Sequence, residues 1–250
     1  MKRASRIFYI IYGYYGESKN VFWGDAVLQI PIWLDLAAVI IGAVSGLWAA
    51  QERKLDLIGH IGLSFLGGLG GGLLRDAAMQ VGSVYMLQSP YPIPIVLMVG
   101  VMGFCFPQII RQHPNLLEWL DILSVGLFVV AGTDKAMVYR LYPMACLLMG
   151  IFTGVGGGML RDIFLGDTPR IFQRSNFYAT AATGGALAYF LLVGGLWVNQ
   201  NIAAVISVAT TIGLRRASLH YNVLSPAELD LTPLVKNAGK KITRYVRRKK

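Results

Sequence analysis

The sequence predicts an all-α polytopic membrane protein with seven transmembrane helices, built as two inverted three-helix repeats plus a seventh helix. Three observations predict this class: the chain is strongly apolar, its apolar stretches have the length of a bilayer, and its two halves resemble each other. Of the 250 residues, 55% are hydrophobic and only 14% are charged. Soluble domains are typically about 25% charged, so the composition favours a membrane protein over a soluble one.

Seven apolar stretches are long enough to cross a bilayer, which takes about 20 helical residues. They lie at about 31–50, 57–76, 93–110, 118–138, 143–162, 175–195 and 198–214. The chain then divides into an N-terminal aromatic, interfacial segment (1–29), a first repeat (30–111), a second repeat (112–196), a seventh helix (197–219) and a basic tail (220–250). A cleaved signal peptide is the alternative for the first segment, although an A-x-A-like cleavage site is lacking.

An internal repeat relates the two halves at an offset of 86 residues. Without any gap, positions 33–76 match positions 119–162 at 15 of 44 places. Each unit contains three spans, and because three is odd, the second unit enters the membrane from the opposite side. Proteins with such inverted repeats commonly place their substrate or ion path near the midplane, at discontinuous helices in corresponding positions of the two halves.

Spans two and five carry a glycine run in corresponding places, "GGLGGGLLRD" at 67–76 and "TGVGGGMLRD" at 153–162. Each interior glycine costs a helix about 1 kcal/mol relative to alanine, so we expect both helices to be kinked and broken there. Carbonyls freed by a break favour a cation; the alternative is that the glycines only allow close helix packing. The predicted path residues are Gly68, Gly70, Gly71, Gly72, Gly154, Gly156, Gly157, Gly158 and Lys135.

Charged residues also recur at this offset. Adjacent residues on a helix point about 100° apart, so we expect each arginine of the Arg-Asp pairs to bind elsewhere, either to backbone carbonyls freed in the other repeat or to a permeating species. We expect the two aspartates near the ends of spans one and four to be structural. Lys135 either snorkels to the interface or faces the water path. The predicted structural or gating charges are Arg75, Asp76, Arg161, Asp162, Asp35 and Asp121.

The basic tail concentrates the net charge of +10 at one end of the chain. The positive-inside rule places this tail in the cytoplasm and, with seven spans, the N-terminus outside. Anionic lipid is the expected partner of the tail, and nucleic acid is not expected. The predicted lipid-binding residues are Lys236, Lys240, Lys241 and Arg244. No motif in the sequence indicates catalysis, a resident metal or a cofactor, so we expect a protein that is not an enzyme.

The doubled GGGxxRD motif in a chain of this layout resembles the prokaryotic branch of the trimeric intracellular cation (TRIC) channels, which overlaps a group of bacterial proteins described as glycine transporters. Three further stretches fit the resemblance, "SGLWAAQERKLDLIG" (45–59), "LDILSVGLFVVAGTDKAM" (120–137) and "RSNFYATAATGGALAYF" (174–190). It covers roughly 30–216. The chain departs from the usual pattern after Asp76, because Pro90 follows it by fourteen residues whereas Pro169 follows Asp162 by seven.

The resemblance implies a plasma-membrane homotrimer in which each protomer has its own pore, lined by the glycine-containing helices and conducting monovalent cations, chiefly K⁺ and also Na⁺. From the residues themselves, a secondary transporter for a small zwitterion such as glycine is the alternative, because a helix break would offer carbonyls to an ammonium and amides to a carboxylate. A purely structural membrane scaffold would leave the repeated glycine runs without a purpose.

Overall fold

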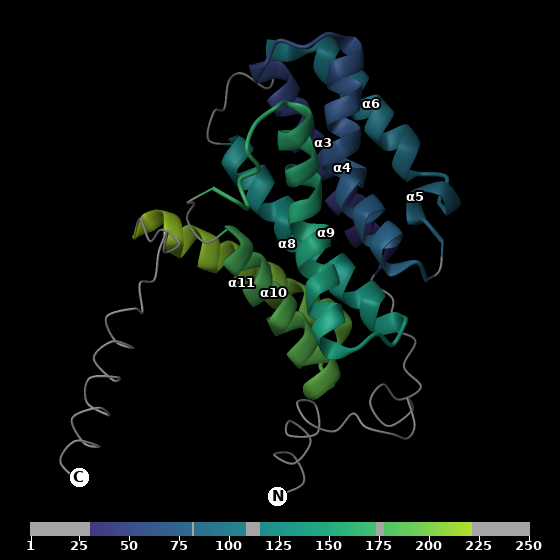
Figure 1. Ribbon diagram of the computed structural model, residues 1–250, viewed down its shortest axis with the longest axis vertical. Helices are drawn as coiled ribbons and strands as arrows, with labels where there is room; N and C mark the ends of the chain where they lie inside the picture. Colours follow the sequence, from purple (N-terminus) through teal and green to yellow (C-terminus); the bar gives the residue numbers. More distant parts are fainter. Residues whose placement is uncertain (1–30, 82, 109–115, 174–177, 222–250) are drawn as a thin grey trace, which may run out of the picture.

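The computed structural model describes residues 31–81, 83–108, 116–173 and 178–221, and within these ranges the regular structure is entirely helical (Figure 1). A π-helical segment, η1 (Leu191–Gly195), directly continues one of the helices. The α-helices are α3 (Ile32–Glu52), α4 (Leu57–Met79), α5 (Tyr85–Gln88), α6 (Pro92–Cys105), α8 (Leu116–Val138), α9 (Pro143–Phe164), α10 (Tyr178–Phe190) and α11 (Gln200–His220).

Among the described residues, five helices are long and apolar enough to cross a membrane: α3, α4, α9, α10 with η1, and α11. Helix α6 is apolar but has only 14 residues, and α8 has 23 residues but carries several charges. Each of the seven predicted spans overlaps one of these helices. The all-helical, multi-pass membrane class predicted from the composition is therefore confirmed.

Glycines bring α4 against α3, and α9 against α8, in the same way. A Cβ at Gly46 of α3 would overlap the carbonyl oxygen of Leu63 in α4. A Cβ at Gly132 of α8 would lie 2.7 Å from the carbonyl oxygen of Met149 in α9. The second pair of residues is the first pair shifted by 86 positions. Equivalent helices therefore pack through equivalent backbone contacts.

The turns that end these helices also correspond. Lys54, after α3, and Arg140, after α8, both have positive φ, 52° and 53°. Gln80, after α4, and Gly166, after α9, have φ of 49° and 76°. A residue in the left-handed region is a common way to end a helix. The 86-residue offset thus extends from the sequence to the backbone conformation of the helix ends.

Hydrogen bonds of buried side chains join α10 to α8 and α11 to α10. Tyr189 of α10 is fully buried and donates its hydroxyl to Oδ1 of Asp134 in α8, at 2.7 Å. Helix α11 packs on α10, where Ser207 donates to the carbonyl oxygen of Gly185 at 2.8 Å. Because Asp134 is only 2% exposed, its carboxylate depends on partners supplied by the protein.

We expect Tyr189→Phe to lower the free energy of unfolding by about 1–3 kcal/mol, because removing a donor from a buried hydrogen-bond acceptor costs about that much. The measurement is thermal unfolding in detergent. Tyr139→Phe is the matched control, since Tyr139 is 41% exposed near the end of α8. Equal unfolding temperatures for the two variants would show that the Tyr189 hydroxyl contributes nothing.

Candidate functional site

The two glycine runs meet where α4 crosses α9, near the middle of the molecule (Figure 1). A Cβ at Gly71 would overlap the carbonyl oxygen of Thr153, and a Cβ at Gly157 would lie 2.9 Å from the carbonyl oxygen of Gly67. Real Cβ atoms essentially never approach another atom so closely. The crossing is therefore a contact between two backbones, and only glycine fits at these positions.

The contacts at this crossing are reciprocal. A Cβ at Gly70 would lie 3.5 Å from the Cα of Gly157 and 3.0 Å from a methyl group of Leu160. A Cβ at Gly156 would lie 3.2 Å from the Cα of Gly71 and 2.9 Å from a methyl group of Leu74. Each α4 position in these contacts corresponds to an α9 position 86 residues later. Such reciprocity is what a local twofold relation produces.

The expected break in these helices is wrong. Helix α4 runs for 23 residues and α9 for 22 residues without interruption, so neither glycine run frees its backbone carbonyls from the helix. The physical reason is that a close approach of two backbones offsets the intrinsic cost of the glycines. Close packing, the alternative interpretation, is the one that the structure supports. A bend at the glycines stays a prediction.

The remaining predicted glycines make no contact across the crossing. Gly68 faces Val39 of α3, and Gly154 faces the equivalent residue of α8, Val125. Gly72 and Gly158 directly follow the crossing glycines, and the closest guanidinium nitrogens, of Arg75 and Arg161, are 3.9 Å from a Cβ added there. Four of the eight glycines thus form the crossing, and two adjoin the charged groups that follow it.

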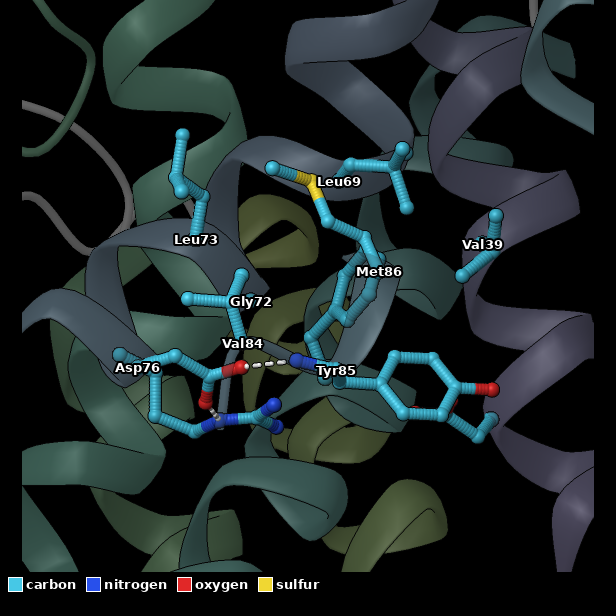
Figure 2. A pocket seen from close by; sticks show the side chains of 12 residues that line it. Val39, Leu69, Gly72, Leu73, Asp76, Val84, Tyr85 and Met86 are labelled. Atoms are coloured by element: carbon cyan, nitrogen blue, oxygen red, sulfur yellow. Dashed lines mark hydrogen bonds and ion pairs between the residues drawn. The ribbon is translucent and has the colours of Figure 1, made fainter. Parts of the chain in front are cut away.

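The first charged cluster surrounds Asp76, near the end of α4. Its Oδ1 accepts hydrogen bonds from Nε of Arg75 and from Nζ of Lys135, both at 2.7 Å. Its Oδ2 accepts from the backbone N–H of Tyr85 at 2.9 Å, as Figure 2 shows. Lys135 also lies 3.3 Å from the carbonyl oxygen of Ser83. Lys135 of α8 thus reaches the connection between α4 and α6.

Tyr85 links this cluster to Asp35 of α3. Its ring extends away from Asp76 (Figure 2), and its side chain hydrogen-bonds Asp35. The other carboxylate oxygen of Asp35, Oδ2, is buried without a hydrogen-bond partner. These residues line a cavity of only about 20 Å³. The cavity beside Asp76 is therefore small, and Arg75 and the α5 residues Tyr85 and Met86 are among the residues that line it.

The second charged cluster surrounds Arg161, near the end of α9. Its Nη2 and Nε lie 3.0 and 3.1 Å from Oδ1 of Asp162. Its Nη1 lies 3.1 Å from Oγ of Ser45 in α3 and 3.5 Å from Oδ1 of Asp121 in α8. The backbone N–H of Arg170 donates to Oδ2 of Asp162 at 3.1 Å. Arg161 thus connects α9 with α3 and α8.

The expectation that adjacent arginine and aspartate side chains do not pair is wrong. Both Arg-Asp pairs form, at 2.7 Å for Arg75–Asp76 and 3.0 Å for Arg161–Asp162. The long arginine side chain bridges the angle between neighbouring positions, and low dielectric makes the pairing strong. Arg161 additionally binds side chains of other helices, instead of the expected backbone carbonyls. Asp121 accepts from Arg161 at 3.5 Å, and its structural role stays a prediction.

The cavities beside the two charged clusters differ in size. Beside Arg161 lies an open vestibule of about 250 Å³, whose floor includes Ala49 of α3. Ala49 is the first-repeat equivalent of Lys135, since the two positions are 86 residues apart. At the first cluster this position is a lysine that binds Asp76, whereas at the second cluster it is an alanine that lines the open vestibule.

Several residues of the site were not predicted. Ser45 had a weak signal as a hydroxyl inside an apolar span, and Arg170 as a cation in the connection between the fifth and sixth spans. Tyr85 lies in the longer connection after Asp76, where the sequence departs from its own repeat. An ion pair between Arg53 and Asp167 joins connections from the two repeats. The predicted lipid-binding residues lie outside the described residues: Lys236, Lys240, Lys241 and Arg244.

Solved structures of TRIC channels are similar to this chain. The TRIC trimeric intracellular cation channel orthologue from Rhodobacter sphaeroides is 30% identical, with a TM-score of 0.70, and the match covers 77% of this chain and 98% of that one. A second structure, described as a structural basis for conductance through TRIC cation channels, is 27% identical with a TM-score of 0.69, covering 80% and 98% of the two chains.

Curated relatives and a family model agree with this likeness. The UPF0126 inner membrane protein YadS of Escherichia coli K12 is 28% identical over 202 residues, which cover 79% of this chain and 96% of YadS. A UPF0126 membrane protein of Deinococcus radiodurans is 30% identical over 161 residues, covering 64% and 75%. A family model described as "Glycine transporter" matches the chain twice, at 32–108 and 118–194. With both repeats matched, this multi-pass integral membrane protein belongs to the glycine transporter family.

Proposed function

We propose that the protein is a K⁺-permeable cation channel with one ion path in each protomer. The path runs from the vestibule beside Arg161, through the α4–α9 crossing, to the cluster around Asp76. The observation that carries this proposal is the reciprocal glycine crossing between two buried ion-pair clusters. The similarity to a TRIC channel, over 77% of this chain and 98% of that one, supports it. In the structure the backbones touch at the crossing, so this arrangement corresponds to a closed path.

Opening requires α4 and α9 to separate, and the glycines make the gap suitable for cations. Because glycine has no side chain, the carbonyl oxygens of Gly67 and Thr153 face the partner helix directly. When the helices separate or bend, these oxygens line the gap. Carbonyl oxygens replace part of a cation's hydration shell at weak sites. The neighbouring clusters contain both signs of charge, which suits modest selectivity among monovalent cations.

The proposed assembly follows the predicted architecture. Three helices in each unit, with α4 and α9 antiparallel, support two inverted three-helix repeats followed by α11 as a seventh spanning helix. The related structure from Rhodobacter sphaeroides is named as a trimeric channel, and we propose a homotrimer here also. The large apolar side chains exposed on α6 and α11 then face lipid or neighbouring protomers.

Transport of a small zwitterion such as glycine is the second candidate. The observation in its favour is the balanced charge of the vestibule, which is lined by three arginines and three acids. Such a site offers cations to a carboxylate and carboxylates to an ammonium. The lining charged residues are Arg53, Arg161, Arg170, Glu52, Asp162 and Asp167.

Planar bilayers under a KCl gradient separate the two candidates. We expect discrete current steps that reverse near the K⁺ equilibrium potential. Saturable uptake of labelled glycine into liposomes, without current steps, would instead favour the transporter.

A disulfide across the crossing tests where the ions pass. A Cβ at Gly70 would lie 3.9 Å from the Cβ of Leu160, within the range of about 3.5–4.5 Å that disulfides adopt. In a background of Cys105→Ala and Cys146→Ala, we expect Gly70→Cys/Leu160→Cys to lose its current steps on oxidation and regain them on reduction.

The single variant Gly70→Cys is the matched control and should respond to neither reagent. The equivalent disulfide, in Leu74→Cys/Gly156→Cys, has a Cβ separation of 3.8 Å, and this variant should respond to oxidation and reduction in the same way. Unchanged currents after complete cross-linking would place the path elsewhere.

A further inference from the structure

The rim of the vestibule beside Arg161 is built by two connections that come from different repeats. Arg53 follows α3, in the connection to α4, and Asp167 follows α9, in the connection to α10. These two residues, 114 positions apart, form an ion pair, and both line the vestibule. The floor lies deeper, since Arg161 and Asp162 are 3% and 6% exposed. The ion pair therefore joins the outer edges of the vestibule above buried charges.

The pair is placed where it can form and break. The side chains of Arg53 and Asp167 are 50% and 43% exposed, so water competes for both partners. An exposed ion pair contributes little free energy. Each partner adjoins a residue with positive φ, Lys54 on one side and Gly166 on the other. Both connections thus turn sharply beside the ion pair, outside the regular helices.

The opposite end of the path has no equivalent pair. The positions that correspond to Arg53 and Asp167 at the 86-residue offset are Tyr139 and Val81. Neither side chain is charged, and the cavity at that end is only about 20 Å³. An ion pair across the rim thus accompanies the wide, open cavity and is absent at the narrow one.

We propose that the Arg53–Asp167 ion pair is a latch across the mouth of this vestibule, which limits access from water to the buried Arg161–Asp162 pair. With the pair formed, the two connections are held together. With the pair broken, they move apart and the floor becomes accessible. The consequence for conduction or transport rests on the function proposed above, whereas the control of access does not.

The test measures access directly. Ala49 lies on the floor and is 8% exposed, so Ala49→Cys, in a background of Cys105→Ala and Cys146→Ala, reports access through its rate of reaction with an uncharged, membrane-impermeant maleimide. We expect Asp167→Asn and Arg53→Gln to raise this rate about twofold to fivefold, the factor that corresponds to an exposed ion pair. The exchanged variant Arg53→Asp/Asp167→Arg should restore the original rate.

Lys54→Asp is the matched control, because Lys54 is exposed, adjacent to Arg53 and absent from the vestibule lining. It should leave the rate unchanged, and aspartate tolerates positive φ. Equal rates in all variants that elute as the intact protein in size-exclusion chromatography would overturn the latch. So would a failure of the exchanged variant to restore the rate.

Current recordings on the same variants separate the two proposals. If Asp167→Asn raises the modification rate while the protein conducts no ions, the latch stands and the channel function fails. If discrete cation currents are present while the modification rate is the same in all variants, the channel stands and the latch fails.

Discussion

Replacing Gly71 with alanine is expected to destabilise the protein by about 1–3 kcal/mol, the usual cost of overpacking a filled interior. The added Cβ would overlap the carbonyl oxygen of Thr153. Because that atom belongs to a helix backbone, it cannot turn aside as a side chain can. The two helices must therefore move apart. Thermal unfolding in detergent, compared with the unsubstituted protein, measures the effect.

Gly62→Ala is the matched control for this prediction. Gly62 lies in the same helix, but a Cβ there would have no atom within 4 Å. Alanine has a higher helix propensity, so we expect this variant to be as stable as the unsubstituted protein or more stable by up to about 1 kcal/mol. Gly157→Ala should resemble Gly71→Ala, because an added Cβ would lie 2.9 Å from the carbonyl oxygen of Gly67. Similar stabilities for Gly71→Ala and Gly62→Ala would show that the crossing is not tightly packed.

Replacing Arg161 with glutamine is expected to cost about 3–5 kcal/mol, the effect of removing one partner from a buried ion pair. Oδ1 of Asp162, which lies 3.0 and 3.1 Å from two nitrogens of Arg161, loses both partners. Asp121, 4% exposed, loses a contact of 3.5 Å. The buried carboxylates then lack the charge that compensates them. The effect is measured by thermal unfolding and by the yield of folded protein.

Arg75→Gln should be milder, although Arg75 is the equivalent of Arg161 in the first repeat. Asp76 retains Nζ of Lys135 at 2.7 Å and the backbone N–H of Tyr85 at 2.9 Å. Arg170→Gln serves as a second comparison, since its side chain is 42% exposed and its contact with Asp121 is 3.6 Å. We expect a loss of at most about 1 kcal/mol there. Equal losses for Arg161→Gln and Arg170→Gln would contradict this account of the cluster.

The sequence by itself determined the membrane class, the approximate positions of the spans and the internal repeat. These properties are local or additive: the length of an apolar stretch is set by the bilayer, and a duplication is visible as identity at a constant offset. The offset also identified the residues that meet at the crossing, since Gly70, Gly71, Gly156 and Gly157 all lie in the two repeated motifs.

Only the tertiary structure decided what the repeated residues do. A glycine run is compatible with a broken helix or with two helices in contact, and the neighbouring helix determines which occurs. Here Thr153 of α9 faces Gly71, so α4 stays continuous. The same holds for side-chain partners: Ser45 and Tyr85 reach the Arg-Asp pairs from distant positions. Lys135 and Ala49 are equivalent in sequence, yet Lys135 forms an ion pair with Asp76 and Ala49 lines the open vestibule, because contacts depend on the assembled helices.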